Sequence, residues 1–183
     1  MKVTVTPLTT LAQVNRAAEM TTHGQPCKAP MRLWYKTEHS PIRLMRFWIE
    51  LHEVPTFVSV HLVRHKYGVE HFVQSMRDDR GGAGDTEVNR LTPVNHGMEV
   101  NAQALINMAK KRLCYKAHKT TVAAFRKLTK AIGEVDPELP RWMVPECVTR
   151  GYCPEFSECK PGLAKVLHAY RDSGPATERR KVQ

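Results

Sequence analysis

The sequence predicts a chain that combines β-strands with α-helices, and two stretches carry this prediction. Residues 1–6 alternate apolar and polar side chains, which is typical of a strand at the edge of a sheet. Between Glu99 and Ile132 apolar residues recur at helical spacing, which predicts one long helix that Gly133 and Pro137 end. The residues that set this spacing are Leu105, Met108, Ala109, Leu113, Ala117, Ala124 and Leu128.

The other elements follow in chain order. Residues 9–20 predict a short helix with Leu11, Val14 and Ala18 on one side, and residues 26–30 predict a loop. Two apolar runs come next, at residues 42–51 and 54–63. Periodicity does not decide whether each run is a strand or a buried helix.

The second half of the chain contains one connector and one further helix. Residues 78–85 hold glycines and paired acids, which predict a flexible connector. A segment rich in proline and cysteine spans residues 140–161, and residues 162–171 predict a last helix. At this length we expect one domain over residues 1–172, followed by a basic, frayed tail over residues 173–183.

Composition points to an ordinary globular protein with an anionic partner. The 183 residues are 42% hydrophobic and 25% charged, as in soluble proteins, and the net charge is +10. This excess favours a nucleotide, a cofactor or a nucleic acid as ligand. Aromatic residues make up only 7% of the chain, which argues against a base-stacking surface for single-stranded nucleic acid.

The sequence also bears on compartment and on metals. No apolar run is long enough to span a bilayer, so we expect a cytoplasmic protein. Cys147, Cys153 and Cys159 are separated by five residues each, wider than the usual spacing of zinc ligands. A zinc site would need Cys114, Cys27 or a histidine to complete it, and we favour free thiols and no metal.

The segment from Arg64 to Arg77 is the most informative about function. Arg64, His65 and Lys66 come directly after an apolar run, and Ser75 and Arg77 follow about ten residues later. Guanidinium forks match phosphate oxygens and a hydroxyl adds a directional donor, so the segment suits phosphorylated ligands.

Polar residues on the predicted long helix form a second candidate site. Asn101 and Arg112 are eleven residues apart, which places them on one helical face, whereas Asn107 is rotated away by about a third of a turn. Amides and a guanidinium on an apolar helix fit the floor of a ligand site. An exposed polar stripe that ends at Lys110 and Lys111 is the alternative reading.

In order and spacing, these two blocks resemble the flavin-dependent thymidylate synthase family. Arg64, His65, Ser75 and Arg77 fit its first signature. The second block is matched by Asn101-Ala102-Gln103, then Asn107, then Arg112 and the residues as far as His118. The resemblance covers about residues 40–160. This chain departs from the signature at Lys66, His61, Gln103 and His118, where the family has Arg, Gln, Arg and Gln, and it lacks the Asn-Glu pair.

The resemblance implies an α+β fold, with a mixed or antiparallel sheet flanked by helices and one long central helix. It further implies a cytoplasmic homotetramer that binds FAD and dUMP where subunits meet. Such an enzyme converts dUMP to dTMP, with methylenetetrahydrofolate as carbon donor, reduced FAD as hydride source and NADPH as reductant.

The resemblance also assigns roles to individual residues. FAD would be held by Arg64, His65, Lys66, Asn101, Gln103 and Asn107. dUMP would be bound by His61, Ser75, Arg77, Arg90 and Arg112, of which Ser75 and Arg77 hold the phosphate. Arg112 would be catalytic, as a fixed cation that favours the ionised pyrimidine.

Two alternatives remain open at this stage. The first is a pyrimidine nucleotide hydroxymethylase on the same scaffold, which would leave a hydroxymethyl group on dUMP instead of a methyl group. The second is a basic nucleic-acid-binding protein without catalysis, which we regard as the weaker prediction.

Overall fold

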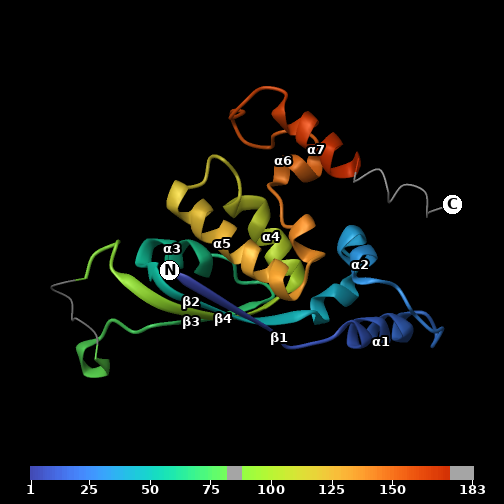
Figure 1. Cartoon of the computed structure of the whole chain (residues 1–183), viewed down its shortest axis with the longest axis horizontal. Coiled ribbons are helices and arrows are strands. Elements are labelled where there is room, and N and C mark those ends of the chain that lie inside the picture. Colours follow the sequence, from blue (N-terminus) through green and yellow to red (C-terminus); the bar gives the residue numbers. More distant parts are fainter. Residues whose placement is uncertain (82–87, 174–183) are drawn as a thin grey trace.

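The computed structural model of the chain describes residues 1–81 and 88–173. It is an α+β structure in which a four-stranded antiparallel sheet is covered by helices (Figure 1). This confirms the predicted fold class and shows the sheet to be antiparallel. In spatial order the strands are β1 (Lys2–Pro7), β2 (Arg46–Pro55), β4 (Pro93–Asn101) and β3 (Val69–Val73).

Each central strand has one buried face and one wetter face. In β2, Phe47, Ile49 and Leu51 are buried, whereas the residues between them are partly exposed. In β4, Val94, His96, Met98 and Val100 are buried in the same alternating way. An antiparallel sheet with one covered face has this pattern, because successive side chains point to opposite sides.

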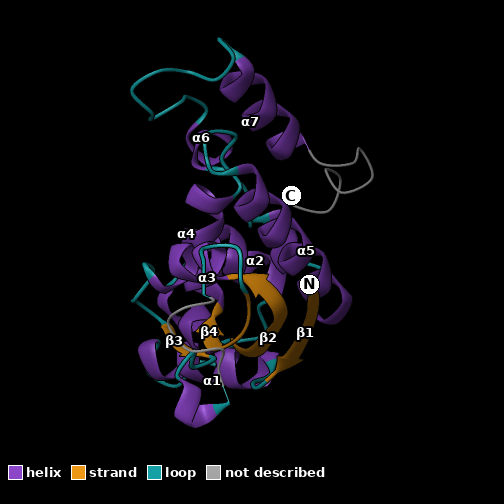
Figure 2. Ribbon diagram, turned by 90° about the vertical axis from the view of Figure 1, so that its left-hand side faces the viewer, coloured by secondary structure: helices purple, strands orange, loops and turns teal. Residues whose placement is uncertain are grey.

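Three helices supply the other half of the core. They are α3 (Thr56–Val63), α4 (Ala102–Arg112) and α5 (Lys119–Val135). All three lie over the same side of the sheet in Figures 1 and 2. Leu105 of α4 and Phe125 and Leu128 of α5 are almost completely buried and join the core formed by the sheet.

The remaining elements lie at the two ends of the molecule. The first end holds α1 (Leu11–Thr21), α2 (Met31–Thr37) and the 3₁₀ helix η1 (Ser40–Leu44), which confirms the helix predicted at residues 9–20 and the loop that follows. The 3₁₀ helices η2 (Asp78–Arg80) and η3 (Leu139–Arg141) are single turns. At the other end α6 (Glu146–Arg150) and α7 (Leu163–Ser173) project from the body (Figure 2), and α7 confirms the last predicted helix.

The prediction of one long helix from Glu99 to Ile132 is wrong. Residues 93–101 form β4, and the helical stretch is divided into α4 and α5 by residues 113–118. Side chains mark both helix starts, because Asn101 accepts a hydrogen bond from the backbone N–H of Ala104 and His118 accepts one from Thr120. Gly133 lies inside α5 and does not end it.

The two ambiguous apolar runs adopt different structures. The first lies mainly in β2, and the second forms the end of β2 followed by α3. The change of structure begins at a register shift between Leu51 and Val54, where Glu53 has a positive φ of 55°. Such a bulge bends the strand, and Pro55 then starts the helix without losing an intrahelical hydrogen bond.

Three further predictions can be compared with the structure only within the described residues. In the predicted connector, residues 78–80 form η2, whereas residues 82–85 lie outside the described part of the chain. Of the predicted tail, only residue 173 lies within it. Within residues 1–81 and 88–173, no helix is long and apolar enough to cross a membrane.

Candidate functional site

A pair of side chains joins the ends of two helices. Arg112 is the last residue of α4, and His65 lies in the turn that follows α3. The Nε–H of Arg112 donates a hydrogen bond of 2.9 Å to Nε2 of His65. A guanidinium has no acceptor, so His65 accepts at Nε2, and the neutral imidazole carries its proton on Nδ1.

The charge state of this pair follows from its environment. Burial lowers the pKa of His65 to about 4, and the positive charge of Arg112 acts in the same direction. The imidazole is therefore neutral near pH 7. Burial and the nearby Arg64 also lower the pKa of Arg112, which nevertheless stays charged. The guanidinium is thus held by an uncharged partner that leaves its positive charge uncompensated.

Other basic groups surround His61, one turn earlier on α3. Its Nδ1 is hydrogen-bonded to Oγ1 of Thr121 at 2.8 Å. Burial lowers the pKa of His61, and the positive charges that lower it further belong to Arg112, Arg64, His118 and Arg90. We refer to these residues together with His65 as the Arg112 site: His61, Arg64, His65, Arg90, Arg112 and His118.

The Arg112 site is cationic and has an aromatic wall. The guanidinium of Arg90 lies over the ring of Phe57, 5.0 Å from its centre, and the ring of His118 meets Phe57 edge-on. Across residues 1–81 and 88–173, no ion pair includes Arg64, Arg90 or Arg112. Because Phe57 is buried beneath Arg90, the groups available to a ligand are the uncompensated guanidiniums, which fit an anion.

The sequence reasoning identified part of this site and missed part of it. It selected Arg64, His65, Arg112 and His61, and it matched Arg90 only loosely. It named His118 as a departure from the family pattern but gave it no role, and it missed Thr121. The signal for both was available, because they start the helix that follows Arg112 and therefore lie near it.

The amides of α4 do not join the Arg112 site. Gln103 donates to Glu38 at 2.6 Å, and Lys110 lies 3.3 Å from the same carboxylate. Asn107 accepts from Lys110 on that side of the helix. Asn101 is the N-cap of α4, and its side chain lies against Gly68 in the turn that carries His65. Its backbone N–H donates to the carbonyl of Gly68.

Ser75 and Arg77 are also separate within one chain. Arg64–Lys66 precede β3 and these two residues follow it, so a strand of five residues, about 17 Å, lies between the groups. Arg77 makes a bidentate ion pair with Asp79, at 2.8 and 2.6 Å, and its side chain is 67% exposed. Lys66 is exposed at the opposite end of the strand.

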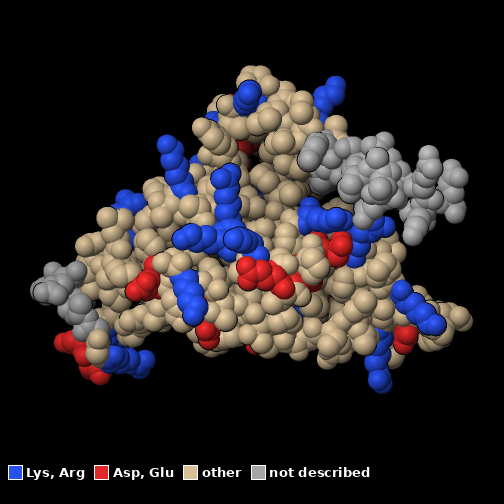
Figure 3. Space-filling model, in the orientation of Figure 1, with Lys and Arg blue, Asp and Glu red and all other residues tan. Residues whose placement is uncertain are grey.

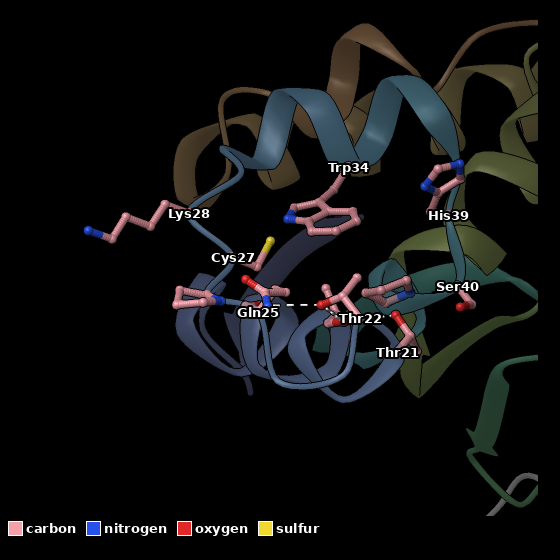
Figure 4. Close-up of a pocket in the computed structure, with 11 residues that line it drawn as sticks. Thr21, Thr22, Gln25, Cys27, Lys28, Trp34, His39 and Ser40 are labelled. Carbon is pink, nitrogen blue, oxygen red and sulfur yellow. Dashed lines mark hydrogen bonds between the residues drawn. The ribbon is translucent and has the colours of Figure 1, made fainter.

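A pocket of about 550 Å³ lies elsewhere, between α1, α2 and the loop that joins them. Figure 4 shows hydroxyls and the Trp34 ring around it, with Lys28 extending away from Trp34. None of the predicted site residues lines this pocket. Its walls offer no inward-pointing cation for a phosphate.

The cysteines do not form a metal centre in the described part of the chain. All five are free, and no cluster of three or more potential ligands is arranged to hold a metal ion among residues 1–81 and 88–173. Burial raises the pKa of Cys147, as do the thiols of Cys114, Cys153 and Cys159. The Cys147 thiol is therefore held mainly in the neutral, less reactive form.

Basic residues are common on the surface as well as in the site. In the view of Figure 3, Lys and Arg side chains stand out across the helical part of the molecule, several of them beside acidic ones. Ion pairs such as that of Lys111 with Glu146, at 2.8 Å, occur in the helical part of the molecule. The Arg112 site differs from them because its guanidinium groups lack such partners.

Comparison with solved structures identifies the fold. The chain superimposes on the thymidylate synthase ThyX of Helicobacter pylori, crystallised with FAD and dUMP, with a TM-score of 0.63 and 14% identity. That match covers 78% of this chain and 99% of the other. The UMP/dUMP methylase PolB of Streptomyces cacaoi, bound with 5-Br dUMP, gives a TM-score of 0.56 and 13% identity over 77% of this chain and 94% of the other.

These likenesses confirm, at the level of the fold, the resemblance that the sequence motifs indicate. No protein-family model matches the chain. No curated protein matches it by sequence either.

Proposed function

We propose that this protein is a flavin-dependent enzyme that modifies C5 of dUMP, as a thymidylate synthase does. One observation carries the proposal. On a fold shared with ThyX, a half-buried guanidinium is held by a neutral imidazole and surrounded by further basic groups. Such a group stabilises negative charge that develops on a bound pyrimidine.

Within this proposal, Arg112 is the catalytic residue. Its free guanidinium nitrogens face the pyrimidine and favour the ionised ring, which is the more reactive form at C5. His61 and Arg90 bind the same nucleotide beside the aromatic wall. Ser75 and Arg77 bind the phosphate. To do so, Arg77 must first break its ion pair with Asp79.

FAD is the cofactor that the proposal requires, and the cationic turn after α3 fits it in part. Arg64 and Lys66 are exposed and suit a pyrophosphate, and His65 borders them. Asn101, Gln103 and Asn107 complete the set, although the Gln103 amide is engaged with Glu38. When bound and reduced, FAD would supply hydride, with NADPH as reductant and methylenetetrahydrofolate as carbon donor.

The separation of the groups within one chain supports a shared site. We propose a cytoplasmic homotetramer in which Ser75 and Arg77 of one subunit meet Arg112 of another. A strand holds the two groups apart within each subunit, and symmetric assembly offers a way to bring them together.

Titration of dUMP, with and without FAD, tests the proposal most directly. We expect dUMP to bind the flavin-loaded protein and a complete reaction to add the mass of a methyl group. A product with the mass of a hydroxymethyl group would favour the hydroxymethylase instead. No dUMP binding, together with salt-sensitive binding of DNA or RNA, would contradict the proposal and favour a nucleic-acid-binding protein.

Mixing two impaired variants, assayed at a dUMP concentration too low to saturate Arg77→Ala, tests the shared site. Arg77→Ala and Arg112→Ala subunits, unfolded and reassembled together, should recover activity, because about one site in four would combine the two unchanged arginines. Each variant reassembled alone is the control. If the mixture stays inactive while a mixture of either variant with wild-type protein is active, each site lies within one subunit.

A further inference from the structure

A series of hydrogen bonds leads from the core to the backbone of His65, whose side chain belongs to the Arg112 site. Oγ of Ser59 lies 2.9 Å from Nδ1 of His96, and Nε2 of His96 lies 2.9 Å from Nδ1 of His71. Nε2 of His71 in turn lies 2.9 Å from the backbone carbonyl of His65. His65 then accepts from Arg112. None of Ser59, His71 and His96 was selected as a site residue from the sequence.

Three different elements contribute to the chain. Ser59 lies on α3, His96 on β4 and His71 on β3. In the register of the sheet His71 faces Met98, so His96 is its diagonal neighbour on the covered face. Ser59 and His96 are 2% and 1% exposed, which places the inner end of the chain in the core.

The donors and acceptors can be assigned from the outer end inward. A carbonyl only accepts, so His71 donates from Nε2 to His65. With neutral rings, His71 accepts at Nδ1, His96 donates from Nε2, and the Ser59 hydroxyl donates to His96. Burial lowers the pKa of His96 to about 4, which favours the neutral ring.

The inner end of the chain is closed, because it stops at the buried hydroxyl of Ser59 and contains no carboxylate. Each of its bonds is satisfied in only one arrangement of neutral tautomers. A buried polar network of this kind fixes the groups at its end, because breaking it would leave unpaired polar atoms.

We propose that His71 and His96 are positioning residues, which hold the turn after α3 so that His65 grips Arg112 by Nε and leaves the other guanidinium nitrogens free for the ligand. The proposal deepens the proposed function and rests on it. Arg64, Lys66, Tyr67 and Gly68 are all exposed, and backbone hydrogen bonds from His65 to Leu62 and from Asn101 to Gly68 hold the two ends of the turn. Its specific claim is that the hydrogen bond from His71, and not the bulk of its ring, sets the position of Arg112.

Two substitutions at position 71 separate hydrogen bonding from packing. His71→Phe keeps a ring but removes both nitrogens, and it should lower turnover of dUMP by up to about 100-fold through misplacement of Arg112. His71→Gln offers an amide N–H to His65 and a carbonyl to His96, and it should restore most of the activity. His52→Phe, on the opposite face of β2, is the matched control and should leave turnover unchanged.

NMR of the ¹⁵N-labelled protein tests the geometry independently of the reaction. We expect His71 and His96 to carry the proton on Nε2, His65 to carry it on Nδ1, and the Nε–H of Arg112 to exchange slowly with water. In His71→Phe the Arg112 exchange should become faster, and in His71→Gln it should remain slow.

The two measurements can fail separately. Equal turnover in His71→Phe and wild type, or equal losses in the Phe and Gln variants, would overturn the positioning role. A proton on Nδ1 of His71, or fast Arg112 exchange in the wild type, would overturn it even if dUMP were never turned over. A protein with the expected tautomers and slow exchange but no dUMP binding would instead contradict the proposed function.

Discussion

Two arginines of this chain show how a partner changes what a guanidinium can do. Arg112 is half-buried and bonded to a neutral imidazole, so its charge is available to a ligand. Arg77 is mostly exposed and bonded at two points to the carboxylate of Asp79, so its charge is already compensated. Arg112 is therefore arranged in advance for an anion, whereas Arg77 has to exchange one anion for another.

The largest effect is expected at Arg112, the arginine whose charge is available to a ligand. Arg112→Ala should reduce turnover about 100- to 1,000-fold, the usual cost of losing one preorganised donor to developing negative charge. FAD affinity should change much less, and steady-state kinetics with a flavin titration measure both. Lys111→Ala removes the same charge from the neighbouring position and should leave turnover near wild type. Equal losses of turnover and FAD binding would contradict the role assigned to Arg112.

A smaller loss is expected at the second arginine. Arg77→Ala should weaken dUMP binding by about 1.5 to 3 kcal/mol, the contribution of a hydrogen bond to a charged group. Calorimetric titration with dUMP measures this loss, and deoxyuridine, which lacks the phosphate, is the control ligand. An affinity for dUMP equal to that of the wild type would rule out Arg77 as the phosphate ligand.

Lowering the pH should destabilise the folded protein, because the buried histidines near Arg112 resist protonation. His65 and His96 have folded-state pKa values of about 4, below the ordinary value of 6.5. The unfolded chain therefore binds protons first, and the free energy of unfolding should fall as pH decreases from about 6.5 to about 4. Above this window their contribution is fully present.

Urea unfolding at several pH values measures this fall. His96→Gln should make the dependence shallower between pH 6.5 and 4, whereas the exposed His23→Gln should not change it. A stability that is independent of pH across this window in the wild type would contradict the neutral state of the buried rings.

The smallest effect is expected when the carboxylate that compensates Arg77 is removed instead of an arginine. Asp79→Asn should free Arg77 and tighten dUMP binding by about 0.2 to 1 kcal/mol, the range for an exposed ion pair. The same titration measures it, and Asp78→Asn at the adjacent position is the control. Weaker dUMP binding in Asp79→Asn would mean that the ion pair helps to orient Arg77 for the ligand.

Local sequence patterns were sufficient to predict a strand or helix where one of its faces is buried and turn or capping residues mark its ends. The strand at residues 2–7 and the helices at residues 11–21 and 163–173 follow directly from periodicity. The alternation of Val94, His96, Met98 and Val100 with polar residues would also have predicted β4, and with it the start of α4. The order of the motif residues indicated a fold that the comparison with solved structures confirms.

The sequence by itself determined which residues are basic, which are amphipathic and in which order the two motif blocks follow. Only the tertiary structure decided that Arg112 is bonded to a neutral histidine, that Gln103 and Asn107 face Glu38, and that Arg77 is compensated by Asp79. The physical reason is that charge state and availability depend on partners from other elements. The covered face of the sheet sets which of these partners meet, and no spacing along the chain records it.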